Sequence, residues 1–105
     1  MIGVLVTFRY GDKFDEQAIR KIAEMARTKF EGMPGLRSKV FAVHPKQREA
    51  LNFYVWDAEE AAHAFFTNAL LERVTELYGV RPTVEFVEVV TFVENARTTS
   101  FAGSP

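Results

Sequence analysis

Several aromatic and titratable side chains stand at positions from which they could build one small-molecule site. Arg9 closes a first apolar run, Tyr54 and Trp56 close another, and His63 lies in the helical segment that follows. An aromatic wall with a few polar groups is the usual form of such a site. Arg9 or His63 would favour the anion of an electron-rich phenol or quinol, and that anion could pass an electron to O2 without metal or flavin.

The residues of this predicted site fall into two roles. Trp56, Arg9 and His63 are assigned to catalysis, and Thr7, Tyr54 and Phe66 to substrate binding. Each also has a plainer interpretation, in which the tryptophan fills the core, the histidine is solvated and the arginine pairs with a carboxylate. No metal site is predicted, because the two histidines lie far apart and no matching carboxylates accompany them. No cofactor is predicted either, and the sequence has no Gly-rich phosphate loop and no dinucleotide fingerprint.

These side chains can meet only if the strands that carry them are neighbours. We expect the first and third strands to lie side by side and to run parallel, so that their carboxyl ends meet beside the helix starts. The residues gathered there would be Thr7, Arg9, Tyr54, Trp56 and His63.

Apolar periodicity and turn signals predict a strand, a helix, two strands, a helix and a strand, in that order. The strands cover 2–10, 36–44, 50–56 and 83–94, and the helices lie between Asp15 and Gly32 and between Asp57 and Gly79. Asp15 suits the cap of the first helix. Asp57 and Glu60 form a capping box for the second, which should kink or restart near Asn68. This order predicts a ferredoxin-like α+β fold, an antiparallel sheet with both helices on one face.

The face of the sheet away from the helices is expected to be apolar as well. Along the third strand an apolar set, Leu51, Phe53 and Val55, alternates with a set that includes Tyr54 and Trp56, so neither side is hydrophilic. A second copy related by a two-fold axis would bury this face, which predicts a homodimer that closes into an α+β barrel. The alternative is a monomer whose core is simply well filled.

Length and composition limit the partners and the location of the chain. Its 105 residues suit one domain over 1–95 and a tail over 96–105, a flexible segment or an arm that docks through Phe101. A net charge of −1, with charges spread along the chain, predicts no nucleic-acid partner. The chain has no cysteine and no apolar run near the ~18 residues of a membrane span, which predicts a cytoplasmic protein without membrane contact.

Two segments carry a resemblance to a known group of proteins. Pro34-Gly35-Leu36 through Lys39, and the stretch 54–61 that reads Tyr-Val-Trp-Asp-Ala-Glu-Glu-Ala, resemble the dimeric α+β barrel superfamily. Within it the chain looks closest to the small monooxygenases of the YdhR-like family, over residues 1 to about 95. The resemblance implies a homodimer and a cofactor-independent monooxygenase acting on a small aromatic substrate of phenol or quinol type.

The same superfamily includes haem degraders, and the match to them is incomplete. Trp56 matches the strand-three tryptophan shared by aromatic-oxidising and haem-degrading members. The strand-one asparagine of the haem degraders is Thr7 here, and their helical histidine lies nearer Phe66 than His63, so haem degradation is less favoured. The second hypothesis is a dimer that binds a small apolar molecule without turning it over.

Overall fold

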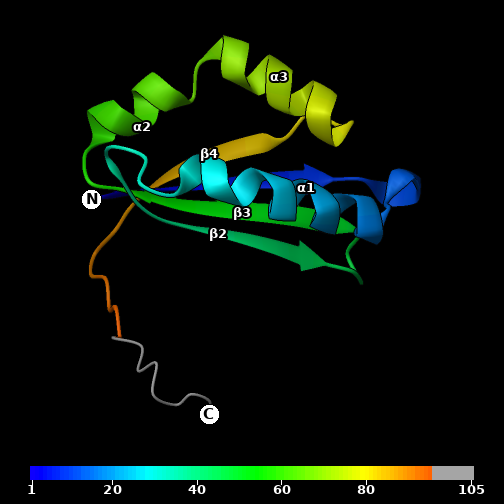
Figure 1. The fold of residues 1–105 in the computed structure, drawn as a ribbon, viewed down its shortest axis with the longest axis horizontal. Helices are drawn as coiled ribbons and strands as arrows, with labels where there is room; N and C mark the ends of the chain where they lie inside the picture. Colours follow the sequence, from blue (N-terminus) through cyan, green and yellow to red (C-terminus); the bar gives the residue numbers. More distant parts are fainter. Residues whose placement is uncertain (96–105) are drawn as a thin grey trace.

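The computed structural model describes residues 1–95 and contains the expected alternation of strands and helices (Figure 1). The elements are β1 (Ile2–Arg9), a short 3-10 helix η1 (Gly11–Lys13), α1 (Glu16–Phe30), β2 (Leu36–His44), β3 (Glu49–Trp56), α2 (Glu59–Phe65), α3 (Asn68–Tyr78) and β4 (Thr83–Glu88). The predicted tail, with Phe101, lies outside the described residues.

A four-stranded antiparallel sheet carries the fold, with the strand order β2-β3-β1-β4. The helices α1, α2 and α3 lie on the same side of this sheet (Figure 1). The predicted ferredoxin-like α+β class is therefore confirmed. None of the helices within residues 1–95 is both long and apolar enough to cross a membrane.

The expected direction of β1 relative to β3 is wrong. The two strands are neighbours but run antiparallel, so Ile2 pairs with Trp56 and Arg9 pairs with Glu49. The crossover through α1 makes β2 run in the same direction as β1, and the hairpin after β2 then reverses the chain into β3. The carboxyl end of β1 consequently lies at the opposite end of the sheet from Trp56.

The start of α1 is as predicted. The Asp15 side chain accepts a hydrogen bond from the Ala18 backbone N–H at 3.1 Å, which satisfies one of the amides that a first helical turn leaves unpaired. The helix ends at Phe30, and Gly32 then takes a φ of +73°, a conformation that favours glycine. Ile19 is the buried residue that anchors α1 against the sheet.

The second helical segment is broken in two, as predicted near Asn68. α2 ends at Phe65 and α3 begins at Asn68. The Thr67 hydroxyl accepts from the Leu70 backbone N–H at 3.1 Å and so caps the new helix. The restart gives α3 its own direction over the sheet (Figure 1).

The predicted capping box at the start of α2 is wrong. Ala58 holds the cap position and has no side chain that could accept a hydrogen bond. Asp57, one residue earlier, accepts instead from Arg37 at 3.3 Å. The helix therefore begins one residue later than the sequence pattern indicates.

A β-bulge interrupts β2 near its start. The register against β3 shifts between Leu36 and Ser38, which leaves Arg37 as an extra residue. Residues three apart in a regular strand point to opposite faces. The bulge lets Leu36 and Lys39 both face the helices.

The last strand is shorter than predicted, because β4 stops at Glu88 rather than Glu94. Its partner β1 begins at Ile2, which already pairs with Glu88, so β1 has no further residues with which those after Glu88 could pair. Val90 and Val93 lie beyond this point and are 96% and 78% exposed.

The side of the sheet without helices, which we call the open face, is apolar at its centre as predicted. It presents side chains from every strand, namely Leu5, Val40, Leu51, Phe53 and Val87. Val40 and Val87 are 55% and 45% exposed. Gly3 lets the Phe53 ring lie across β1, since a Cβ at Gly3 would come within 2.8 Å of the Phe53 Cζ.

Candidate functional site

A cavity of about 320 Å³ lies between the helices and the sheet. Strand residues such as Val6 and Phe8 line it from below, α1 and α3 supply its sides, and Phe66 closes one end. Met25 of α1 and Leu77 of α3 also line it, although they are 73% and 59% exposed. The entrance to the cavity therefore lies between α1 and α3.

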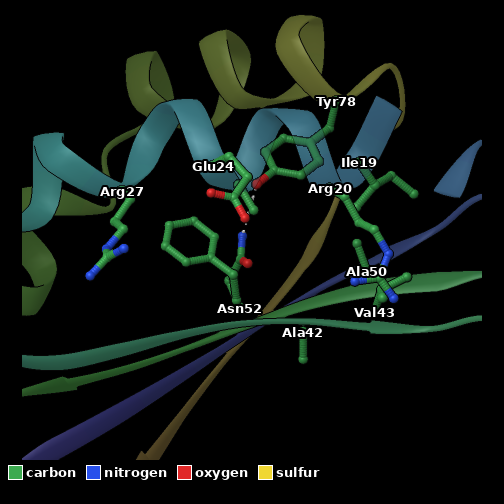
Figure 2. A pocket seen from close by; sticks show the side chains of 11 residues that line it. Ile19, Arg20, Glu24, Arg27, Ala42, Val43, Ala50, Asn52 and Tyr78 are labelled. Atoms are coloured by element: carbon green, nitrogen blue, oxygen red, sulfur yellow. Dashed lines mark hydrogen bonds between the residues drawn. The ribbon is translucent and has the colours of Figure 1, made fainter. Parts of the chain in front are cut away.

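Asn52 and Tyr78 form a polar pair in the wall of this cavity. Asn52 is a buried residue of β3, and its side-chain amide donates to the Tyr78 hydroxyl at 3.3 Å (Figure 2). The Tyr78 ring stacks on Phe8, with centroids 3.9 Å apart and an interplanar angle of 10°, which fixes the direction of the hydroxyl. The amide keeps a second N–H and its oxygen for hydrogen bonds to a ligand.

The tyrosine hydroxyls around the cavity stay protonated at neutral pH. Burial raises the pKa of Tyr78, and the hydrogen bond from Asn52 partly opposes that rise. Burial also raises the pKa of Tyr54, with a smaller contribution from Tyr78. Each hydroxyl can therefore act as a hydrogen-bond donor.

A second cavity, of about 270 Å³, shares Asn52 and Tyr78 with the first. Charged residues of α1 line it, namely Arg20, Glu24 and Arg27. Figure 2 shows Asn52 and Tyr78 approaching each other from β3 and α3 in its wall. The polar pair thus borders both an apolar space and a space with charged side chains.

Tyr54 is the centre of an aromatic cluster at the α2 end of the cavity. Its ring centroid lies 4.9 Å from that of Phe66 and 5.8 Å from that of Phe65, and the Trp56 ring is parallel to it at 6.1 Å. Trp56 is 2% exposed, and its Nε1 has no hydrogen-bond partner among residues 1–95. The tryptophan therefore supports this wall from behind and stiffens it.

Lys39 adds an amine to the same wall. It lies opposite Tyr54 in the sheet, and its Nζ is 3.5 Å from the centroid of the Phe30 ring, 4.1 Å from that of Phe41 and 4.3 Å from that of Tyr54. No ion pair joins this amine to a carboxylate within the described residues. Burial, and secondarily repulsion by Lys29, lowers the pKa of Lys39 to about 7.

Some of the residues predicted for the site meet at this cavity. Tyr54 and Phe66 line it, and Trp56 packs behind them with its ring centroid 6.2 Å from that of Phe66. The aromatic wall expected from the sequence is present. Its neighbours are Lys39 and Asn52 rather than the predicted cation and imidazole.

Thr7, Arg9 and His63 lie elsewhere, so the expected cluster is not formed. Thr7 belongs to the open face, and Arg9 at the end of β1 pairs with Glu49 at 3.4 Å. His63 is exposed on α2, with its Nε2 3.3 Å from a Glu59 carboxylate oxygen. Alternation places Thr7 and Arg9 on the open face, away from Tyr54 and Trp56, and the antiparallel pairing of β1 and β3 also carries Arg9 to the far end of the sheet from Trp56.

Asn52, Tyr78 and Lys39 are the site residues that sequence reasoning missed. Two of them carried a signal, because alternation puts Asn52 on the same strand face as Tyr54 and Trp56. It likewise puts Lys39 on the same face as apolar residues of the second strand. A polar residue among apolar residues on the helix-facing side of a strand indicates a position that lines a cavity. Tyr78 carried no such signal, since it only ends a helix.

The polar groups of the cavity are hydrogen-bonding and acid–base groups. No set of three or more His, Cys, Asp or Glu side chains that could hold a metal ion occurs within residues 1–95. The arrangement can bind a flat apolar ring between aromatic side chains. It can also orient a polar substituent of that ring at Asn52 and Tyr78, and exchange a proton at Lys39.

Comparison with solved structures gives several matches over nearly the whole chain. Rv0793 from Mycobacterium tuberculosis is 13% identical with a TM-score of 0.65, covering 89% of this chain and 98% of that one. The ActVA-Orf6 monooxygenase of Streptomyces coelicolor, solved with nanaomycin D, is 18% identical with a TM-score of 0.62, covering 90% and 92%. SnoaB, a cofactor-independent oxygenase from Streptomyces nogalater, is 11% identical with a TM-score of 0.64, covering 90% and 97%.

These likenesses establish the fold of the chain. The chain shares their fold, so the fold implied by the resemblance to the dimeric α+β barrel superfamily is confirmed. The narrower resemblance to the YdhR-like family is not confirmed. No family model matches the chain, and no curated protein matches it in sequence.

Proposed function

We propose that this protein is a cofactor-independent monooxygenase that oxidises a small phenol- or quinol-type aromatic in the cavity between its sheet and helices. The observation that carries the proposal is a mostly apolar cavity with one oriented polar pair, Asn52 and Tyr78, in its wall. The names of the structural neighbours support the same chemistry, since one is a monooxygenase solved with a ligand and another is a cofactor-independent oxygenase.

The proposed reaction needs only the substrate and O2. Loss of the phenolic proton makes the ring electron-rich enough to give an electron to O2. Recombination with the superoxide forms a C–O bond to the ring, and the O–O bond then breaks so that one oxygen atom stays on the ring. The other oxygen atom leaves as water while the phenol becomes a quinone, so the substrate supplies every electron that reduces O2. The protein contributes binding, orientation of the ring and exclusion of bulk water.

Each cavity residue has a role in this proposal. Asn52 and Tyr78 hold a polar substituent of the ring by hydrogen bonds, because both present donors to the cavity. Tyr54 and Phe66 pack against the ring, and Trp56 keeps Tyr54 in place. The cavity is not lined by Thr7, Arg9 or His63. These three residues therefore have no role in the proposed reaction.

The proposed working form is a homodimer joined through the open face. This face leaves Val40 and Val87, on its two edge strands, half-exposed, and water is a poor partner for such a surface. A two-fold axis would let the same patch bury itself on both copies. A cytoplasmic location stays a prediction from the sequence.

An oxygen electrode tests the proposed reaction. We expect the purified protein, dialysed against a chelator, to consume O2 with α-naphthol and to form an equal amount of quinone, measured by absorbance. Asn52→Leu keeps the approximate volume but removes the amide, and it should lower the rate by about 10-fold or more, as expected for one hydrogen bond to a developing charge.

Tyr10→Phe is the matched control. The Tyr10 hydroxyl is buried without a hydrogen-bond partner among the described residues and lies outside the cavity, so its loss should leave the rate unchanged. Oxygen uptake at the wild-type rate in Asn52→Leu would show that the reaction does not take place in this cavity. Binding of α-naphthol without oxygen uptake would support the second hypothesis, a dimer that binds a small apolar molecule without turnover.

A further inference from the structure

Lys39 stands where the apolar cavity meets solvent. It lines the cavity of about 320 Å³ and also a shallow pocket of about 380 Å³ at the edge of β2. Its side chain is half-buried, and the Phe30 and Tyr54 rings beneath its Nζ also line the cavity. The amine is therefore within reach of a molecule bound in the cavity.

The charged groups that face these two spaces are mostly cationic. They are Arg27 and Lys29 of α1, Arg37 and Lys39 of β2, and the carboxylate of Glu31 after α1. Glu31 already pairs with Arg27 at 3.5 Å. From β3 and α3 the titratable groups are the phenols of Tyr54 and Tyr78. An anion bound beside Lys39 would therefore meet positive charge, and no carboxylate among the described residues forms an ion pair with Lys39 itself.

The amine can change its protonation state near neutral pH. Burial lowers the pKa of Lys39 to about 7, and repulsion by Lys29 acts in the same direction. A general base is most effective when its pKa lies near the working pH. A neutral amine can accept a proton, and the ammonium that results attracts the anion left behind.

We propose that Lys39 takes the phenolic proton of the bound substrate and then holds the phenolate as its ammonium ion. The O–H bond of the phenol breaks and an N–H bond forms at Nζ. Only a proton moves between the two groups, so neither group is oxidised or reduced. This inference rests on the proposed function and names its substrate class: phenols or quinols with a second polar substituent opposite the hydroxyl, so that the hydroxyl meets Lys39 and the other substituent meets Asn52.

The sheet places the base and the polar pair at a distance suited to one ring. Asn52 lies two residues from Tyr54, the partner of Lys39 across the sheet. Such diagonal neighbours on one face are about 7–8 Å apart. A single aromatic ring could therefore direct one oxygen to Lys39 and the opposite substituent to Asn52.

Titration with para-nitrophenol tests the proposal without any oxidation. At about pH 8, above the pKa of about 7 for Lys39, the amine is mostly neutral and the free probe is mostly ionised. Binding should then take up close to one proton per probe, measured by the pH change in a weakly buffered solution. Lys39→Met should weaken binding by about 10-fold or more and abolish the uptake.

Two further variants separate a base from a structural cation. Lys39→Arg keeps a charge that cannot be given up, so it should bind nitrophenolate with no proton uptake. Lys21→Met, on the exposed side of α1, should behave like the wild type. Wild-type binding without uptake, or uptake that survives Lys39→Met, would overturn the proposal. Proton uptake without oxygen consumption on α-naphthol would refute the oxygenase alone, and the reverse result would refute only the role of Lys39.

Discussion

Replacing Lys39 by methionine is expected to stabilise the fold by an amount that depends on pH. Burial lowers the pKa of Lys39 from 10.5 to about 7. A pKa difference of one corresponds to about 1.4 kcal/mol, so the charged amine costs the folded state about 5 kcal/mol below pH 7. Methionine has a similar shape and no charge, so Lys39→Met should raise the free energy of unfolding by up to about 5 kcal/mol near pH 6.

The sign of the pH dependence follows from the direction of the shift. The folded-state pKa lies below the unfolded-state value, so between about 7 and 10.5 the unfolded chain binds the extra proton and wild-type stability rises with pH. From about pH 7 to about pH 9 the wild type should gain about 2–3 kcal/mol relative to Lys39→Met. Measurements stay below the ionisation of the buried tyrosines, because burial raises the pKa of Tyr10 to about 12 and stability is lost as such groups ionise.

Urea denaturation at one fixed protein concentration provides the assay. Wild type, Lys39→Met and the exposed control Lys21→Met should be compared at three pH values, with the control following the wild type throughout. Wild-type and Lys39→Met curves that keep a constant separation from pH 6 to pH 9 would refute the reasoning, because the amine would then be charged in both states.

Two other predictions concern the open face and the turn before β2. Val40→Lys should convert the proposed dimer to a monomer in light scattering while leaving circular dichroism unchanged, because Val40 is 55% exposed within one chain; a dimer that persists would place the interface elsewhere. Gly35→Ala should lower the free energy of unfolding by about 1–3 kcal/mol, because Gly35 has a φ of +82° and its new Cβ would lie 3.0 Å from the Ala61 Cβ. Gly32→Ala, with a φ of +73° and open space around it, should cost less in the same urea titration, and equal losses would contradict the role of the Ala61 contact.

The fold could be predicted because its signals are local. Asp15 caps α1, the Thr67-Asn68 pair ends one helix and starts another, and alternation reveals the faces of β3. The end of β4 could not be predicted in this way. Its apolar residues continue past Glu88, but a strand needs a partner, and the length of β1 decides where pairing stops.

The site was predicted only in part, because it depends on pairing between distant segments. The aromatic wall around Tyr54 and Trp56 lies on one short strand and was visible in the sequence. The cation that joins it, Lys39, comes from another strand, whereas the predicted Arg9 lies on the open face and, because β1 and β3 are antiparallel, at the far end of the sheet from Trp56. The contact of Asn52 with Tyr78 joins residues 26 positions apart, which no local pattern reveals.

The extra residue in β2 has a consequence for how the two ends of this strand can change. Leu36 belongs to the packing around Trp56, whereas Lys39 belongs to the cavity, and an uninterrupted ladder that included Arg37 could not serve both. Without Arg37 the pairs Leu36–Trp56, Ser38–Val55 and Lys39–Tyr54 would follow one another in a regular ladder. Deleting this residue should therefore remove the bulge and still leave Leu36 and Lys39 on the side of the helices. The strand could thus gain or lose its extra residue without turning either side chain to the other face.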